Sequence, residues 1–433
     1  MSARVLGMCR ADEATVSVGH FDRLNVRFAN NDVTTNGSVE SIGLHLTVSF
    51  GRRSASISVT ETGEAALKEA VLKVESIARL SPENPEHMPV PGPRDFEEGK
   101  TYAEGTAESG AGEMMGWVRP VVEQARSARI LGAGYVERSI RTGALANSAG
   151  LFAYDRATNV NFSMTARTRD GRGSGWASTQ VTDSGELDLG PVGERAIEKA
   201  IASKRPAAME AGRVTVVLEP AAVRDLVSLL GFGLHRRPVD ERRSFLNELA
   251  GDRDPVGEDL FGSKATIYSD PLDRRVPCAT HAGGIPRNRT EWVVDGVLRN
   301  LSVNRFWAKQ RGIEPLPGPG NWIVPGEGKS RGDLIEAVDE GVLITRLWYL
   351  RMVQPQSLLY TGLTRDGTFR IENGQVREAV NNFRFNESPV NVLRNLVASG
   401  KPERVMGSEG SMPMLVPGMV VEDFNLSSVS DAS

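Results

Sequence analysis

An alternation of apolar and polar residues between positions 42 and 59 constrains the fold most strongly. The apolar positions are Ile42, Leu44, Leu46, Val48 and Phe50, and after a short Gly51-Arg-Arg turn they continue at Ala55, Ile57 and Val59. A period of two is typical of a strand that buries one face. The first sixty residues are therefore predicted to be strands, and residues 42–59 to be a hairpin with one apolar face.

Two further segments define the N-terminal region. Leu67, Val71, Val74 and Ile77 recur at helical spacing, which predicts an amphipathic helix lying over this sheet. Residues 82–98 contain five prolines and can form neither a helix nor a central strand, so they are predicted to be an extended connector.

The rest of the chain divides near residue 204. A helix near 114–127, a strand-rich region from 129 to about 181 and a helix near 193–203 precede the small, polar segment 204–213. That segment breaks both periodicities and is typical of a domain boundary, in a chain whose length favours two domains. We therefore expect one domain over residues 1–203 and another over residues 213–433.

The second half is predicted to begin with a buried strand at 214–218 and a helix whose first residue is Pro220. Val223, Leu226, Leu230 and Leu234 mark one face of this helix, and His235 is expected to end it. Beyond it we expect mostly short strands and Gly/Pro turns, with one helix near 331–339.

Composition excludes several classes of function. The formal net charge is −4 and the sequence pI is about 5.9, so no broad basic field favours nucleic acid as a partner. The sequence has no secretory signal and no apolar run of membrane-spanning length, which predicts a cytoplasmic protein without a membrane partner. Cys9 and Cys278 are expected to be reduced and structural.

Three known binding or catalytic motifs are incomplete in this sequence. Gly328-Lys329-Ser330 lacks the glycine that a phosphate-binding loop requires five positions before its Gly-Lys pair, where this chain has Ile323. Gly132-Ala-Gly134 would place Glu137 where a dinucleotide fingerprint requires its third glycine. No serine lies in a Gly-x-Ser-x-Gly elbow next to a plausible histidine partner, so nucleophilic catalysis has no support in the sequence.

Several segments, taken in order, resemble the TldD/PmbA family. They are residues 27–33, 214–230, 341–353, 361–374, 381–386 and 421–425, together with the proline connector, and they cover almost the whole chain. The resemblance implies an α+β fold of two domains, an N-terminal mixed α/β domain with an antiparallel sheet and helices, and a C-terminal domain rich in antiparallel strands.

The resemblance also implies a two-subunit zinc peptidase that processes modified precursor peptides or unstructured peptides. The TldD-type subunit carries a His-Glu-x-x-x-His motif and a downstream cysteine at its metal site. The TldE/PmbA-type subunit lacks these residues and completes the chamber.

The motif positions distinguish the two types of subunit. His235 matches the first histidine, but Arg236 stands at the glutamate and Asp240 at the second histidine, while Ser411 is the nearest counterpart of the cysteine. Zinc needs imidazole, thiolate or carboxylate ligands, and its water needs a carboxylate base; arginine supplies neither. These four positions are therefore interpreted as a degenerate zinc site, and the chain is predicted to bind no metal and to have no catalytic or cofactor-binding residue.

Alternative roles stay open for some residues. His235 could be a relic ligand acting with Asp240 and His281, although a histidine packed at a helix C-terminus, where its proton is favoured, is the simpler interpretation. His281 is otherwise expected to be a loop residue. A cluster of arginines could steer an acidic peptide or pair with a partner's carboxylates, or simply be a solvated face; its members are Arg236, Arg237, Arg242 and Arg243.

The resemblance therefore predicts a metal-free TldE/PmbA-like subunit that pairs with a zinc-bearing TldD-like peptidase subunit. The partner would hold the zinc, and a peptide would be the substrate, one able to add as a strand to the strand-rich C-terminal region. Without that partner the chain is expected to be inactive, and a homodimer of the isolated chain stays open. Two alternatives are a self-sufficient hydrolase or biosynthetic enzyme with a non-standard metal site, and a peptide-binding protein without activity.

Overall fold

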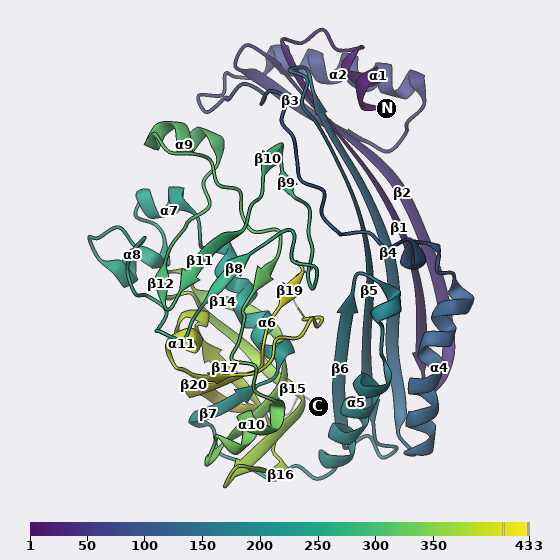
Figure 1. The fold of residues 1–433 in the computed structure, drawn as a ribbon, viewed down its shortest axis with the longest axis vertical. Coiled ribbons are helices and arrows are strands. Elements are labelled where there is room, and N and C mark those ends of the chain that lie inside the picture. Colours follow the sequence, from purple (N-terminus) through teal and green to yellow (C-terminus); the bar gives the residue numbers. More distant parts are fainter. Residues whose placement is uncertain (409, 411, 431–433) are drawn as a thin grey trace.

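A computed structural model describes residues 1–408, 410 and 412–430. Figure 1 shows a long, curved N-terminal sheet standing beside a C-terminal region built of several smaller sheets. The fold is α+β, with an antiparallel N-terminal sheet and a strand-rich C-terminal region, so the predicted fold class is confirmed.

The N-terminal sheet contains six antiparallel strands in the order β3-β2-β1-β4-β5-β6. Their bounds are β1 (Glu13–Ala29), β2 (Asp32–Phe50), β3 (Arg53–Val59), β4 (Leu131–Asn147), β5 (Phe152–Arg167) and β6 (Ser174–Val181). The predicted hairpin is confirmed as β2 and β3, with Leu44 opposite Val59. Gly19 pairs with Gly43 on one side and Gly143 on the other, so three adjacent positions on β2, β1 and β4 carry no side chains.

One face of this sheet is covered by helices. Near one end, α1 (Ser2–Leu6) and α2 (Glu64–Leu80) pack on the buried side chains of β1 and β2. Near the other end lie α4 (Ala111–Ser127) and α5 (Gly190–Ala202). The predicted helix is confirmed as α2, but Ile77 is 45% exposed and does not belong to its buried face.

The segment between α2 and α4 is almost devoid of regular structure. It contains only the short helix α3 (Glu104–Glu108), and residues 86–103 form neither helix nor strand, as the prolines predict. Between β6 and α5 lies the 3-10 turn η1 (Ser184–Glu186).

The C-terminal region is centred on a ring of strands. The sheet order β14-β7-β20-β17-β15-β16, together with the pairing of β14 and β15, closes a ring of five strands, and β18 pairs with β20 outside it. The bounds are β7 (Gly212–Leu218), β14 (Glu340–Gln354), β15 (Leu359–Glu372), β16 (Gln375–Ala379), β17 (Asn382–Glu387), β18 (Leu396–Ser399) and β20 (Met419–Ser430). The expectation of mostly short strands is wrong for β14, β15 and β20.

A second, five-stranded sheet has the order β12-β11-β8-β13-β19, and β9 and β10 form a separate hairpin. These short strands are β8 (Ile267–Ser269), β9 (His281–Ala282), β10 (Ile285–Pro286), β11 (Thr290–Val294), β12 (Val297–Leu298), β13 (Trp322–Ile323) and β19 (Met414–Leu415).

Several short helices complete the C-terminal region. They are α6 (Pro220–Ser228), η2 (Leu229–Phe232), α7 (Arg236–Asp240), α8 (Phe245–Ala250), α9 (Arg305–Arg311), α10 (Arg331–Glu336), η3 (Pro355–Ser357) and α11 (Pro389–Arg394). The predicted helices after residues 220 and 331 are present, but α7, α8, α9 and α11 were not predicted. These four have five to seven residues each, too few to show a helical period.

Buried charges join the two halves of the molecule. Lys199 of α5 is ion-paired with Glu219, the N-cap residue of α6, and Arg331 approaches the same carboxylate at 2.9 Å. Asp366 accepts hydrogen bonds from Ser174 of β6 and from Arg346 of β14. Within the described part of the chain, no helix is long and apolar enough to cross a membrane.

Candidate functional site

The segment predicted to match the zinc motif lies at the start of α7, apart from the preceding helix. Regular structure after Pro220 ends with η2 at Phe232, and His235 is the N-cap residue of α7, with extended backbone at φ −123° and ψ 134°. The prediction that His235 ends the preceding helix is therefore wrong. The expectation that its proton is favoured is also wrong, because partial desolvation of the ring lowers the pKa of His235.

His235 lines a cavity of about 700 Å³ between α7, α9 and the β9–β10 hairpin. Its Nδ1 is hydrogen-bonded to the hydroxyl of Ser302 at 2.5 Å. Arg237, Trp307 and Ile285 also line the cavity, so its wall is both aromatic and basic. The space is large enough for a few amino-acid residues of a peptide.

Both oxygens of the Asp240 carboxylate lie close to neighbouring donors. Oδ1 lies 3.0 Å from Nε of Arg236, whereas Oδ2 accepts a 2.7 Å hydrogen bond from the indole of Trp307 and lies 3.3 Å from Nε of Arg311. A second carboxylate, Asp254, accepts two hydrogen bonds from Arg236 at 3.0 and 2.7 Å.

These side chains do not fit a zinc site. The described residues contain no group of three or more His, Cys, Asp or Glu side chains that could hold a metal ion. A guanidinium within hydrogen-bond distance of Asp240 would also repel a divalent cation placed there. That His235, Arg236 and Asp240 are degenerate zinc-site positions stays a prediction.

The arginine cluster forms a network of ion pairs. Arg237 donates to Glu241, the C-cap residue of α7, and makes two hydrogen bonds to Glu86 of the proline connector, at 2.7 and 2.8 Å. Arg243 donates to the same Glu241, and Arg242 lies 3.7 Å from Asp252. The cluster therefore presents much less positive charge than its sequence indicates, and Arg237 ties the connector to α7.

The fourth predicted position, Ser411, lies outside the described residues. Its described neighbours contact α6: Arg224 donates to the carbonyl of Met412 at 2.8 Å, and Ser408 donates to Asp225 at 2.7 Å. Gly410 and Met412 line a second cavity, of about 490 Å³, while His235 lines the first. Ser408 and Met412 are therefore bonded to α6, and among the described residues neither forms a hydrogen bond with His235.

This second cavity lies where strands β4, β5 and β6 face loops of the C-terminal region. Its described wall includes Arg287 and Arg404, two residues that the sequence analysis did not single out. Arg404 is far from β5 and β6 in sequence but contacts both, and no local pattern could have indicated this.

His281 lies in β9 rather than in a loop, so that expectation is wrong. Its Nε2 is 3.4 Å from Oδ1 of Asp155 on β5, and its ring packs on Phe96 with centroids 5.0 Å apart. His281 therefore links the connector, the N-terminal sheet and the C-terminal region. Asp240 and His235 make their own recorded contacts elsewhere, so the structure does not join these three residues in one site.

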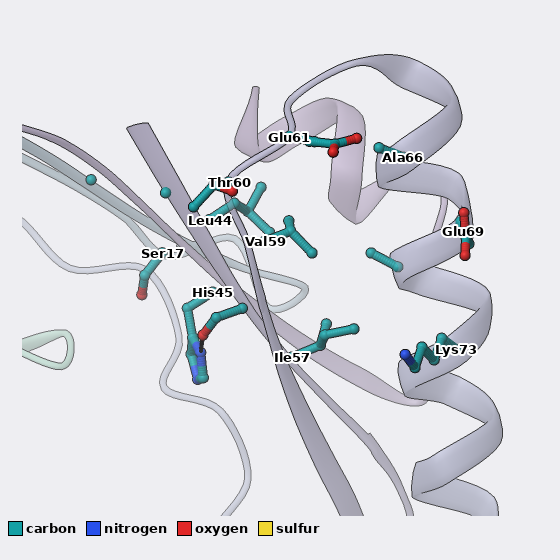
Figure 2. A pocket seen from close by; sticks show the side chains of 14 residues that line it. Ser17, Leu44, His45, Ile57, Val59, Thr60, Glu61, Ala66, Glu69 and Lys73 are labelled. Carbon is teal, nitrogen blue, oxygen red and sulfur yellow. Dashed lines mark hydrogen bonds between the residues drawn. The ribbon is translucent and has the colours of Figure 1, made fainter. Parts of the chain in front are cut away.

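A third hollow, of about 610 Å³, lies at the free edge of the N-terminal sheet. Figure 2 shows Ile57 and Val59 of β3 facing α2, from which Glu69 and Lys73 project, whereas Ser17 and His45 lie on the other side of the strands. Among the described residues β3 forms a ladder with β2 alone, and its other edge has a single bridge, from Arg53 to Glu83, so the rest of that edge could accept an added strand. The prediction that a peptide adds to the C-terminal strands stays untested.

Comparison with protein families gives three consecutive matches. Residues 14–78 match the PmbA/TldA metallopeptidase domain 1, residues 108–204 the central domain and residues 211–428 the C-terminal domain. No curated protein matches the chain.

Three solved structures share the fold. TldE from Thermococcus kodakarensis aligns with a TM-score of 0.83 at 18% identity, covering 98% of each chain. A protein from Thermotoga maritima, described as a candidate modulator of a DNA gyrase, aligns with a TM-score of 0.84 at 18% identity over 98% of each chain. A protein from Bacteroides thetaiotaomicron with a similar description has a TM-score of 0.85 at 18% identity, over 99% of this chain and 98% of the other.

Proposed function

Because the chain belongs to the PmbA/TldD metallopeptidase family, we propose that it is a metal-free, TldE-like subunit of a peptide-processing complex. Its partner would be a TldD-like subunit that holds the zinc and cleaves the peptide. This chain would complete the chamber, and a cytoplasmic location is part of the same proposal.

One observation carries the proposal, namely the way in which Asp240 is bonded. A zinc ligand must offer a lone pair to the metal, but both oxygens of Asp240 already face Arg236, Trp307 and Arg311. If Asp240 is not a ligand, His235 is the only imidazole among the described residues that line its cavity, and none of these residues is a carboxylate that could activate a water molecule. The structural similarity to an archaeal TldE agrees with this assignment at the level of the fold.

In this proposal the chain's own residues bind and orient the peptide. The cavity beside His235 offers the aromatic wall of Trp307, over which the guanidinium of Arg237 lies at 5.0 Å from the ring centroid. Arg237 is bonded to Glu86 and Glu241, and within the described structure it keeps two of its five N–H groups for further polar contacts. The lowered pKa of His235 keeps its ring neutral at pH 7, where it can accept or donate one hydrogen bond.

Co-expression with a TldD-like protein containing His-Glu-x-x-x-His tests this function. We expect the two chains to co-elute at micromolar concentration, and peptidase activity to require both. A control replaces the first histidine of that partner's motif, which should abolish cleavage but preserve co-elution. Separate elution, or cleavage by this chain alone, would overturn the proposal.

A further inference from the structure

The second cavity, which we call the arginine cavity, has an excess of positive charge in its described wall. Four arginines and two carboxylates line it: Arg141, Arg224, Arg287, Arg404, Glu137 and Asp155. The carboxylates have contacts outside this set, because Glu137 accepts a hydrogen bond from Tyr135 and lies 3.7 Å from Arg23, and Asp155 lies beside His281. Among the described residues neither forms an ion pair with Arg287 or Arg404, although Asp155 is near enough to favour the charged form of Arg287.

Arg404 is held by neutral oxygen atoms. Its Nε donates to Oε1 of Gln180 at 3.2 Å, one terminal nitrogen to the hydroxyl of Thr182 at 2.7 Å, and the other to Oδ1 of Asn159 at 3.2 Å. A guanidinium has five N–H donors, so these contacts fix its plane but leave two donors without a recorded acceptor among the described residues. These three partners carry no charge, and Glu186 acts on Arg404 only from beyond ion-pair distance.

Arg287, which lines the same cavity, is likewise held by uncharged acceptors. It donates only to backbone carbonyls, from Nε to Gly318 at 3.2 Å and from one terminal nitrogen to Ala279 at 3.3 Å and His281 at 3.0 Å. Its second terminal nitrogen has no recorded acceptor in the described structure. A Cβ at Gly320 would lie 2.5 Å from Sγ of Cys278 and 3.1 Å from a terminal nitrogen of Arg287, so the glycine leaves room for both side chains.

Both guanidinium groups lose much of their contact with water. Burial is the main cause that lowers the pKa of Arg404 to about 10; the charge of Glu186 opposes this effect, and the charge of Arg224 adds to it. Burial also lowers the pKa of Arg287, against the opposing effects of Cys278 and Asp155. An arginine guanidinium stays charged at pH 7, so both charges lie in a site where burial destabilises them. An anion that enters the cavity would relieve that destabilisation.

We infer that the arginine cavity binds a carboxylate of the peptide, either its C-terminal carboxylate or that of an acidic side chain. The paired N–H groups of a guanidinium match the two oxygens of a carboxylate. This inference rests on the proposed function in taking a peptide as the ligand. It also gives the metal-free subunit a specific role, which is to bind the negatively charged carboxylate of the peptide.

Titration calorimetry of the full chain at low ionic strength tests the inference with three peptides. The first is N-acetyl-tetra-alanine with a free C-terminal carboxylate, the second is its C-terminal amide, and the third is the amide with glutamate in the last position. We expect at least one carboxylate peptide to bind about tenfold more tightly than the plain amide. Whichever of the two binds more tightly identifies the source of the carboxylate.

The variants Arg287→Met and Arg404→Met should each remove this tenfold preference, and Arg404→Lys should retain part of it. Arg119→Met, on the exposed side of α4, is the matched control and should change nothing. Circular dichroism of each variant separates lost binding from lost folding.

Equal binding of all three peptides would overturn the inference, as would tighter binding of inorganic phosphate than of either carboxylate peptide. The test is independent of the partner. If the chain prefers carboxylate peptides but does not co-elute with a TldD-like subunit, only the proposed function is refuted. If it co-elutes but shows no such preference, only the carboxylate site is refuted.

Discussion

Replacing Glu219 by glutamine should destabilise the junction between the two halves of the molecule. Glu219 neutralises Lys199, whose side chain is 5% exposed, and the glutamate itself is 12% exposed. The neighbouring Lys199, Arg331 and Arg195 lower the pKa of Glu219 in spite of its burial, while burial lowers the pKa of Lys199. The substitution keeps the shape of the side chain but leaves the ammonium group buried without a counter-ion.

The expected cost is about 3–5 kcal/mol, the range found when one partner of a buried ion pair is removed. This is a large fraction of the roughly 5–15 kcal/mol that stabilises a typical folded protein. The carbonyl of Trp176, 3.3 Å from Nζ of Lys199, is a neutral acceptor and cannot replace the charge. Because the pKa of Glu219 is lowered on folding, this stabilisation is present at pH 7 and is lost as the pH falls through the folded-state pKa.

Urea unfolding followed by far-UV circular dichroism at pH 7 measures this effect. The matched control is Glu403→Gln, which breaks an ion pair with Arg195 whose side chains are 34% and 41% exposed, and should cost less than about 1 kcal/mol. The double variant Lys199→Met/Glu219→Leu should recover most of the lost stability, because it leaves no buried charge. The reasoning is refuted if Glu219→Gln costs no more than Glu403→Gln.

Three further predictions concern packing, thiols and pH. Gly134→Ala should destabilise the protein by about 1–3 kcal/mol, because a Cβ there would lie 2.3 Å from Phe28. Gly116→Ala on α4 is the control: its Cβ would meet open space, and the variant should be more stable by up to about 1 kcal/mol. Thermal melts of both variants measure the two changes. Burial raises the pKa of Cys278 to about 11, so iodoacetamide at pH 8 should alkylate it about a hundredfold more slowly than in urea, and an equal rate would contradict this. Because folding lowers the pKa of His235, the contribution of this histidine to stability should be lost as the pH falls below about 6.5. His235→Gln should therefore make the free energy of unfolding depend less on pH in that range. An unchanged dependence on pH would refute this prediction.

The N-terminal region was predictable because its periodicities are long and unbroken. The alternation from Ile42 to Val59 continues through two paired strands, and burial on one face leaves only one register compatible with the pattern. Helices α2 and α4, of 17 residues each, show enough turns to reveal their apolar faces.

The long C-terminal strands could not be predicted because their pattern is interrupted. β14 shifts register at three places along β15, and Tyr349 within it has φ +58°, so the alternation changes phase before it becomes visible. Asp366 and Gly367 interrupt β15 in the same way, with φ +55° and +124°. Each strand therefore looks like several short ones in the sequence.

Only those residues of the candidate site that lie close together in the sequence could be predicted. Resemblance to a family motif singled out His235 and Asp240, but two of the three partners of Asp240, Trp307 and Arg311, come from α9, more than sixty positions away. Arg404 reaches Asn159 across 245 positions, and only the folded chain brings them together. Contacts between residues so far apart cannot be identified from a single sequence.

The zinc content of the chain purified alone tests the central claim most directly. It can be measured by elemental mass spectrometry after dialysis without chelator, with the co-expressed TldD-like subunit as a positive control. The account predicts little or no zinc in this chain and about one zinc per partner chain. Close to one zinc per chain in this protein, lost on His235→Ala, would contradict the account and make this chain the metallopeptidase itself.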